Sequence, residues 1–253
     1  MKRKICIAGI ILLCAAFLFS GFMVYRQYTD EKQSKEEFYH LAGLIPAIPE
    51  NPDDEVNEEI PVSAFDKYAD IYALNNDLIG WISIDGTKIN YPVMQTKDRP
   101  NFYLKHNFEK QYSDYGVPYV SETCDIDISD NTIIYGHHMK NGTMFNSLES
   151  YKSKEFYESH KIIRFDTLGG YGEYEIIAVF KTVAYSDKGF KYYQFDNAAD
   201  ETAFNKYVAR CKELSFYDTG LSAEYGDKLI TLSTCEYSNQ NGRLVVVAKK
   251  IMD

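Results

Sequence analysis

The sequence of 253 residues predicts a mainly β fold, in which short strands close, or nearly close, into a barrel that carries two inserted helices. Two observations support this fold class. Strand-like runs follow one another closely, and helical patterns do not alternate regularly with them, which argues against a parallel α/β sheet. Aromatic residues make up 15% of the chain, with 22 tyrosines, and such residues favour strands.

The first element in the chain is a basic and then apolar N-terminus. Basic residues at 2–4 precede an uncharged run of about twenty residues over 5–24, ICIAGIILLCAAFLFSGFMV. At about 1.5 Å per helical residue, such a run spans the ~30 Å hydrocarbon core of a bilayer. It is longer than the apolar part of a signal peptide, and nothing up to Tyr28 resembles a small-x-small cleavage site. We therefore expect an uncleaved transmembrane anchor over 5–24, with a cytoplasmic stub over 1–4 and the remainder outside.

A flexible acidic and proline-rich stalk is expected over 25–60. TDEKQSKEE is charged, and IPAIPENPDDEVNEEIP combines four prolines with a run of acids. This composition cannot bury a core and stays extended or mobile. A folded domain over 61–253 follows, and it begins with a short N-terminal helix in which apolar residues recur at helical spacing (Phe65, Tyr68, Ile71 and Leu74).

Beyond this helix the pattern changes to strands. In GWISIDGTKINYPVM, residues 80–94, Asp85-Gly86 lies between two alternating runs and is the sharpest hairpin signal in the chain. Two helical patterns, 143–157 and 198–213, interrupt the strands. Further strands are expected at 117–120, 131–135, 161–167, 174–185, 228–234 and 243–251.

Charge and cysteine usage exclude several function classes. The formal net charge of −10 makes nucleic acid an improbable partner. Two cysteines lie in the apolar run, and the odd number beyond it leaves at least one free thiol (Cys124, Cys211 and Cys235). The sequence has no CxxC motif or Cys/His ligand cluster, and the adjacent histidines at 137–138 are a poor chelate by themselves. We therefore expect neither a metal site nor a cofactor.

One thiol, in TLSTCEYSNQNGR (231–243), is marked as a candidate nucleophile by strand alternation. Ser233 and Cys235 fall on one polar face with Thr231, whereas Ile230 and Leu232 fall on the other. An isolated cysteine is more often a buried structural residue. A structural cysteine would, however, share the face of the two apolar side chains, so the pattern favours a functional thiol.

A histidine pair follows another predicted strand, in NTIIYGHHM (131–139). Period-two alternation places Tyr135 and His137 on the same side, with Gly136 marking close approach or the end of the strand. A histidine at a strand end suits a general base, although a lone histidine is more often a solvent-exposed loop residue. His138 is a rival for the role, and spacing does not choose between the two.

Arg243 opens the last predicted strand. The intervening EYSNQNG is rich in turn formers, which places Cys235 and Arg243 near the facing ends of neighbouring strands. A guanidinium there can donate hydrogen bonds to an oxyanion. A strand-edge arginine paired with an acidic neighbour is the structural alternative.

YGHHM, TLSTC and the arginine eight residues later together resemble the signature of sortases, the transpeptidases that attach proteins to the Gram-positive cell wall. TLSTC with a helical segment before it resembles class B in particular, and the resemblance extends over about 65–251. It implies a closed eight-stranded β-barrel, with His137 as the catalytic histidine, Cys235 as the nucleophile and Arg243 as the essential arginine. The resemblance also implies a substrate groove lined by Tyr135, Ser233, Glu236 and Leu104.

The activity implied by the resemblance is transfer of a surface protein at the cell membrane. Cys235 would attack the threonine carbonyl of a C-terminal sorting signal of the NPxTN or N/S-P-x-T-G type. Arg243 and the amide of Glu236 would stabilise the oxyanion, and His137 would protonate the leaving amine. An amine of peptidoglycan, or of its lipid-linked precursor, would then resolve the acyl-enzyme.

Two alternatives remain at this level. An extracellular cell-wall cysteine peptidase would use similar groups, although papain-like hydrolases place Cys before His in the chain, the reverse of the order here. A non-enzymatic, membrane-anchored binding module would also suit the acidic, tyrosine-rich exterior. In that case Cys235 would be buried and unreactive.

Overall fold

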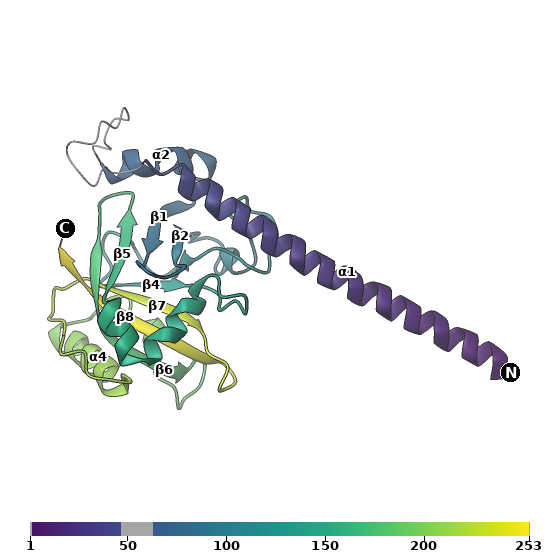
Figure 1. The fold of residues 1–253 in the computed structure, drawn as a ribbon. Helices are drawn as coiled ribbons and strands as arrows, with labels where there is room; N and C mark the ends of the chain where they lie inside the picture. The colour runs from purple at the N-terminus through teal and green to yellow at the C-terminus, as the bar shows by residue number, and fades with distance from the viewer. Residues whose placement is uncertain (1, 47–62, 253) are drawn as a thin grey trace.

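The structure, a computed structural model, describes residues 2–46 and 63–252 (Figure 1). Eight strands close into a barrel in the order β1-β2-β3-β4-β7-β8-β6-β5, which confirms the predicted fold class. Neighbouring strands are antiparallel except for β2–β3 and β4–β7, and β1 pairs with β5 to complete the circle. The strands are β1 (Leu78–Ser83), β2 (Asn90–Met94), β3 (Tyr119–Val120), β4 (Asn131–Tyr135), β5 (Ile162–Thr167), β6 (Glu173–Val183), β7 (Leu229–Cys235) and β8 (Gly242–Met252).

The strands form where alternation and turn chemistry predicted them. β1 and β2 make the expected hairpin, and Gly86 in its turn has φ +74°, a conformation that glycine adopts without strain. β7 and β8 pair from Leu229–Lys249 to Cys235–Arg243, so the turn between them begins directly after the candidate nucleophile.

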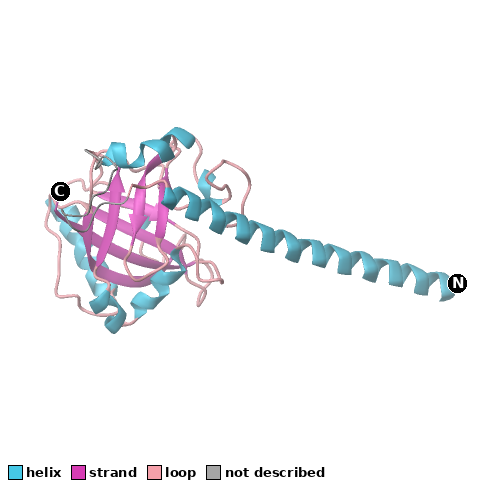
Figure 2. Ribbon diagram, turned by 45° about the horizontal axis from the view of Figure 1, so that its top comes forward, coloured by secondary structure: helices cyan, strands magenta, loops and turns pink. Residues whose placement is uncertain are grey.

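Helices cover the outside of the barrel (Figure 2). α2 (Ala64–Leu74) and α4 (Glu201–Leu214) agree with the predicted helices, and the side chains of Ser63 and Asp200 cap their N-termini. The helix predicted over 143–157 is wrong as one continuous element. It is divided into a 3₁₀ helix η2 (Phe145–Lys152) and a short helix α3 (Lys154–Ser159), because Ser153 has an extended backbone and caps the second helix. Two further 3₁₀ turns are η1 (Phe102–Leu104) and η3 (Tyr192–Gln194).

The expected stalk is wrong for residues 25–43. They continue the N-terminal helix α1 (Lys2–Gly43), which projects far from the barrel in Figure 1. Ion pairs four residues apart support this charged stretch, at 2.6 Å between Lys35 and Glu31. At its C-terminal end Phe38 and Leu41 are buried against the barrel, so these apolar side chains bind a helix that charge composition alone would leave mobile. The remaining stalk and the start of the domain, 47–62, lie outside the described residues.

Two apolar clusters sit on opposite faces of β7 and β8. Ile230 and Leu232 belong to the main core, together with residues of most strands. Val245 and Val247 of β8 instead pack under α4, with Phe204 and other apolar residues of that helix. The polar face of β7 therefore lies on the side of the sheet that α4 and η3 cover, away from the main core.

Candidate active site

The thiol of Cys235 lies at the end of β7, on the face opposite Ile230 and Leu232, as strand alternation predicted. Cys235 is half-buried and lines a groove of about 430 Å³. The other cysteines of the domain differ from it: burial raises the pKa of the Cys124 thiol to about 11 and that of Cys211 to about 12. Among the described cysteines of the domain, Cys235 is thus the thiol placed for reaction.

The same groove receives most of the predicted site residues. It runs across the outer mouth of β4, β7 and β8, segments far apart in the chain. Glu236 is the one predicted site residue that does not line it. The predicted residues that do are Leu104, Tyr135, His137, Ser233, Cys235 and Arg243.

Arg243 lies directly opposite Cys235 in the antiparallel pairing of β7 and β8. Paired residues on neighbouring strands project to the same face, so the guanidinium and the sulfur share one side of the sheet. Arg243 Nη1 donates to the carbonyl of Gly242 at 2.9 Å, which fixes the half-buried side chain beside the groove. A cation so placed can stabilise negative charge that develops next to the sulfur.

His137 follows β4 and is half-buried in the groove. Its Nε2 lies 2.7 Å from the carbonyl oxygen of Leu104. Because a carbonyl only accepts hydrogen bonds, Nε2 carries the proton and Nδ1 of the neutral ring is the acceptor. Burial lowers the pKa of His137, Lys105 lowers it further, and the Leu104 bond and Asp114 oppose the shift. The neutral ring is therefore favoured at neutral pH.

His138, the rival histidine, faces the backbone of the candidate nucleophile. Its Nδ1 lies 3.0 Å from the carbonyl oxygen of Cys235 and 3.7 Å from a carboxylate oxygen of Glu149. Unlike His137, it does not line the groove. The two adjacent histidines thus have different surroundings, which sequence spacing could not distinguish.

Glu236 departs from its expected place. It is buried, and its carboxylate accepts hydrogen bonds from Lys152 at 3.1 Å and from the Ser238 amide at 3.0 Å. Its own amide donates to the carbonyl of Gly242 at 2.9 Å. The amide expected to stabilise an oxyanion is therefore already engaged in the neck of the β7–β8 turn.

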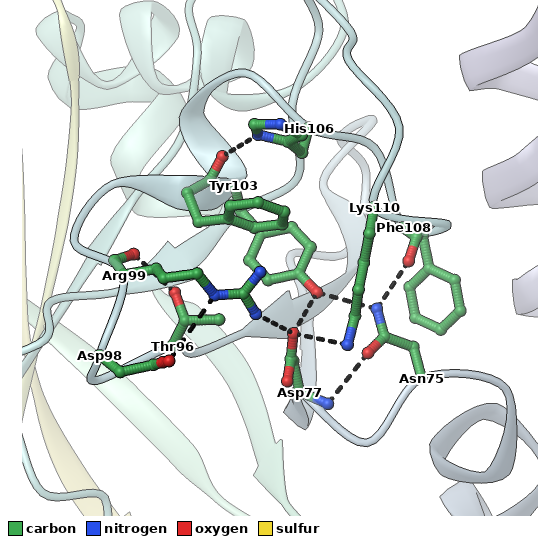
Figure 3. Close-up of polar contacts among 10 residues, drawn as sticks. Asn75, Asp77, Thr96, Asp98, Arg99, Tyr103, His106, Phe108 and Lys110 are labelled. Carbon is green, nitrogen blue, oxygen red and sulfur yellow. Dashed lines mark hydrogen bonds and ion pairs between the residues drawn. The ribbon is translucent and has the colours of Figure 1, made fainter.

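A polar cluster fixes the wall that carries Leu104 (Figure 3). The carboxylate of Asp77 accepts a hydrogen bond from the Tyr103 hydroxyl at 2.8 Å and lies 2.9 Å from the ammonium of Lys110. Asn75 donates to the same hydroxyl and to the Phe108 carbonyl, at 2.9 and 2.6 Å. These bonds hold η1, and with it the carbonyl that contacts His137.

Sequence reasoning missed the aromatic side of the groove. Tyr192 is buried and its hydroxyl lies 2.6 Å from the Ser233 hydroxyl, while Tyr185 is 77% exposed and has φ +57°. The abundance of tyrosine was the available signal, but it did not indicate which tyrosines meet. The missed lining residues include Asn101, Tyr119, Glu122, Tyr185, Tyr192 and Tyr193. Within residues 2–46 and 63–252, no group of three His, Cys, Asp or Glu is arranged to hold a metal ion.

Comparison with known proteins agrees with this geometry. The family model described as "Sortase domain" matches residues 82–251. The chain is 30% identical to Sortase B of Staphylococcus aureus over 254 residues, which cover 99% of this chain and 98% of that protein. It is 31% identical to Sortase B of Listeria monocytogenes over 248 residues, which cover 95% and 94% of the two chains.

A solved structure is similar over most of the fold. The Staphylococcus aureus sortase B–substrate complex superposes with a TM-score of 0.74 at 29% identity, covering 88% of this chain and 98% of that one.

Proposed function

The chain belongs to the sortase family, in class B, and from this premise we propose that Cys235 is the nucleophile of this cysteine transpeptidase and that His137 and Arg243 assist it. The observation that carries the assignment is the single groove lined by the thiol, the imidazole and the guanidinium. Membership of a transpeptidase family decides against the non-enzymatic binding module.

The reaction begins with attack by the thiolate, because a thiol is a weak nucleophile. The thiol proton passes to the free nitrogen of His137, and the sulfur bonds to the carbonyl carbon of the threonine in a sorting signal. Arg243 stabilises the oxyanion that forms. The carbon–nitrogen bond then breaks, and the imidazolium gives its proton to the leaving amine, which leaves a thioester on Cys235.

An amine of peptidoglycan or of its lipid-linked precursor completes the cycle. It attacks the thioester, forms a new amide bond and releases the sulfur. The solved sortase B complexes support this order, since one is described as a substrate complex and another is complexed with triglycine, a peptide with a free amine. Signals of the NPxTN or N/S-P-x-T-G type are the proposed acyl donors.

The protonation state makes the enzyme slow. With reference pKa values of about 8.5 for Cys and 6.5 for His, the thiolate–imidazolium pair amounts to about 1% of the neutral pair. Burial lowers the pKa of His137 and makes the imidazolium rarer still. The enzyme therefore works through a minor form, and turnover is limited by its population.

The N-terminal helix is the membrane anchor. α1 is long and apolar enough to cross a bilayer by length and composition, with no part of its apolar window buried in the protein. We assign the span to 5–24, the cytoplasmic stub to 1–4 and the external catalytic domain to 61–253, with the basic N-terminus inside. The barrel then works at the outer membrane surface, where lipid-linked wall precursors are presented.

The test uses the full-length chain in detergent micelles, a panel of peptides carrying the two motif types, and triglycine as the acceptor. Mass spectrometry is expected to find a threonyl–glycine amide for at least one motif, and Cys235→Ala is expected to remove it while the circular dichroism spectrum is retained. Free acid as the sole product would identify a peptidase instead. Transfer that persists in Cys235→Ala would refute the nucleophile.

A further inference from the structure

The peptide group that follows the nucleophile is held at both of its polar ends. The amide N–H of Glu236 donates to the carbonyl of Gly242 at 2.9 Å. The carbonyl of Cys235 lies 3.0 Å from Nδ1 of His138, and since it can only accept, Nδ1 of His138 is the donor. The plane of the Cys235–Glu236 peptide is thus fixed from the turn on one side and from the loop after β4 on the other.

A second bond joins the same two segments in the opposite direction. The hydroxyl of Tyr237 donates to the carbonyl of His138 at 3.1 Å. The rings of Tyr237 and His138 also meet edge to face, with centroids 5.1 Å apart. Residues nearly one hundred positions apart in the chain are therefore joined reciprocally beside the groove.

Charged residues support His138 from η2. Glu149 Oε1 lies 3.7 Å from His138 Nδ1, and Lys152 bridges Glu149 and Glu236 at 2.6 and 3.1 Å. Burial acts to raise the pKa of Glu236, but hydrogen bonds from Ser238 and Lys152 prevail and lower it. Glu236 is therefore a carboxylate that ties the turn to η2, a role different from lining the groove.

We propose that His138 is a positioning residue for the transpeptidase reaction, and that it acts by holding the Cys235–Glu236 peptide. Cys235 is the last residue of β7, so beyond it the strand ladder no longer fixes the backbone. The bond from His138 takes over that function and sets the direction in which the sulfur enters the groove. Because His138 adjoins His137, the same bond also sets the separation of the imidazole of His137 from the thiol.

The proposal rests on the function assigned to Cys235 and predicts a specific kinetic pattern. Misdirection of the sulfur slows attack without weakening the contacts that bind the peptide. His138→Leu is expected to lower kcat by about 10- to 100-fold and to change KM by less than about twofold. His138→Gln keeps a side-chain N–H that can donate to the Cys235 carbonyl, and it is expected to recover kcat to within about threefold of wild type.

The experiment measures acylation of the full-length chain in micelles under single-turnover conditions, with triglycine added in a parallel arm. The pH profile of kcat/KM is recorded for wild type, His138→Gln and His138→Leu. Tyr237→Phe serves as a milder second variant, since the ring is 68% exposed and only the hydroxyl bond to His138 is lost. It is expected to lower kcat by less than His138→Leu, again with KM retained.

The outcomes separate the possible roles of His138. Equal activity of wild type and His138→Leu overturns the proposal, and so does an equal loss in Leu and Gln that leaves the pH profile unchanged. Loss of the acidic limb in His138→Gln would make His138 the proton-transfer group itself. If His138→Leu does not fold, an unchanged kcat in Tyr237→Phe counts against the clasp. Alkylation of Cys235 by iodoacetamide, slowed or accelerated in Leu but not in Gln, supports it even if wild type transfers to no peptide tested.

Discussion

The immediate surroundings of His137 combine opposing charges. Lys105 and Asp114 are paired at 2.8 Å, with side chains 47% and 56% exposed, close enough to act on the ring from the edge of the groove. The ammonium lowers the pKa of His137 and the carboxylate raises it, while burial is the largest influence and lowers it. This pair offers a way to move the titration of the proposed acid without touching it.

Single substitutions at this pair are expected to shift the acidic limb of the kcat/KM profile in opposite directions. Lys105→Gln removes a positive charge, raises the pKa of His137 and moves the limb to higher pH. Asp114→Asn removes a negative charge and moves it to lower pH. Full pH profiles of wild type and both variants check this.

High salt provides the control for these two variants. Since both side chains are largely solvated, 1 M salt is expected to reduce both shifts. Limbs that coincide in all three proteins at low salt would show that His137 does not govern the acidic limb.

The contact between α1 and the barrel contains a buried carboxylate. Both carboxylate oxygens of Glu37 are buried, with no hydrogen-bond partner among the described residues. Burial raises the pKa of Glu37 to about 7, and the nearby charges of Glu109 and Asp30 also raise it. Docking of the helix is therefore easiest when Glu37 is protonated.

The stability of this contact is expected to fall as pH rises. With a folded-state pKa of about 7 against an ordinary value of 4.5, the contribution is complete below pH 4.5 and is lost as pH rises through about 7. Glu37→Gln, a permanent mimic of the neutral form, is expected to raise the Tm at pH 8 relative to wild type and to have little effect at pH 4.5.

Glu36→Gln is the matched control, because Glu36 lies on the same helix with its side chain 69% exposed. Thermal melts of the full-length protein between pH 4.5 and 8 distinguish the two variants. Equal responses of Glu36→Gln and Glu37→Gln would contradict the role of the buried carboxylate.

On the scale of the whole molecule, one helix has two solvents. The first part of α1 exposes large apolar side chains such as Leu12 and Leu18, each 71% exposed, while its last turns are buried on the barrel. This division fits a chain that is anchored in a bilayer at one end and held rigidly against its catalytic domain at the other.

Charge placed in the apolar run is expected to release the protein from the membrane. Leu12→Arg combined with Leu18→Arg costs about 2.5–3.5 kcal/mol per residue near the centre of a span. Alkaline carbonate extraction followed by immunoblotting is expected to leave wild type in the membrane pellet and this variant largely in the supernatant.

Tyr39→Arg is the corresponding control on the same helix. It lies beyond the run and is 81% exposed, so the protein is expected to stay in the pellet. Wild type in the supernatant would refute the anchor.

Local rules predicted much of the fold and the thiol of the site. Alternation in TLSTC placed Cys235 opposite Ile230 and Leu232, and Asp85-Gly86 located a hairpin, because strand period and turn chemistry act between near neighbours. The helical pattern over 143–157 was interrupted in the structure by the extended backbone of Ser153, which periodicity does not detect.

By itself the sequence determined the strand faces, the apolar N-terminal run and the family to which the chain belongs. Only the tertiary structure decided that His138 faces the Cys235 carbonyl, that Glu236 ties the turn to Lys152, and that α1 docks on the barrel. The physical reason is distance along the chain. These contacts join residues that barrel closure brings together from about a hundred positions apart, or from opposite ends of the chain, and no local pattern encodes such partners.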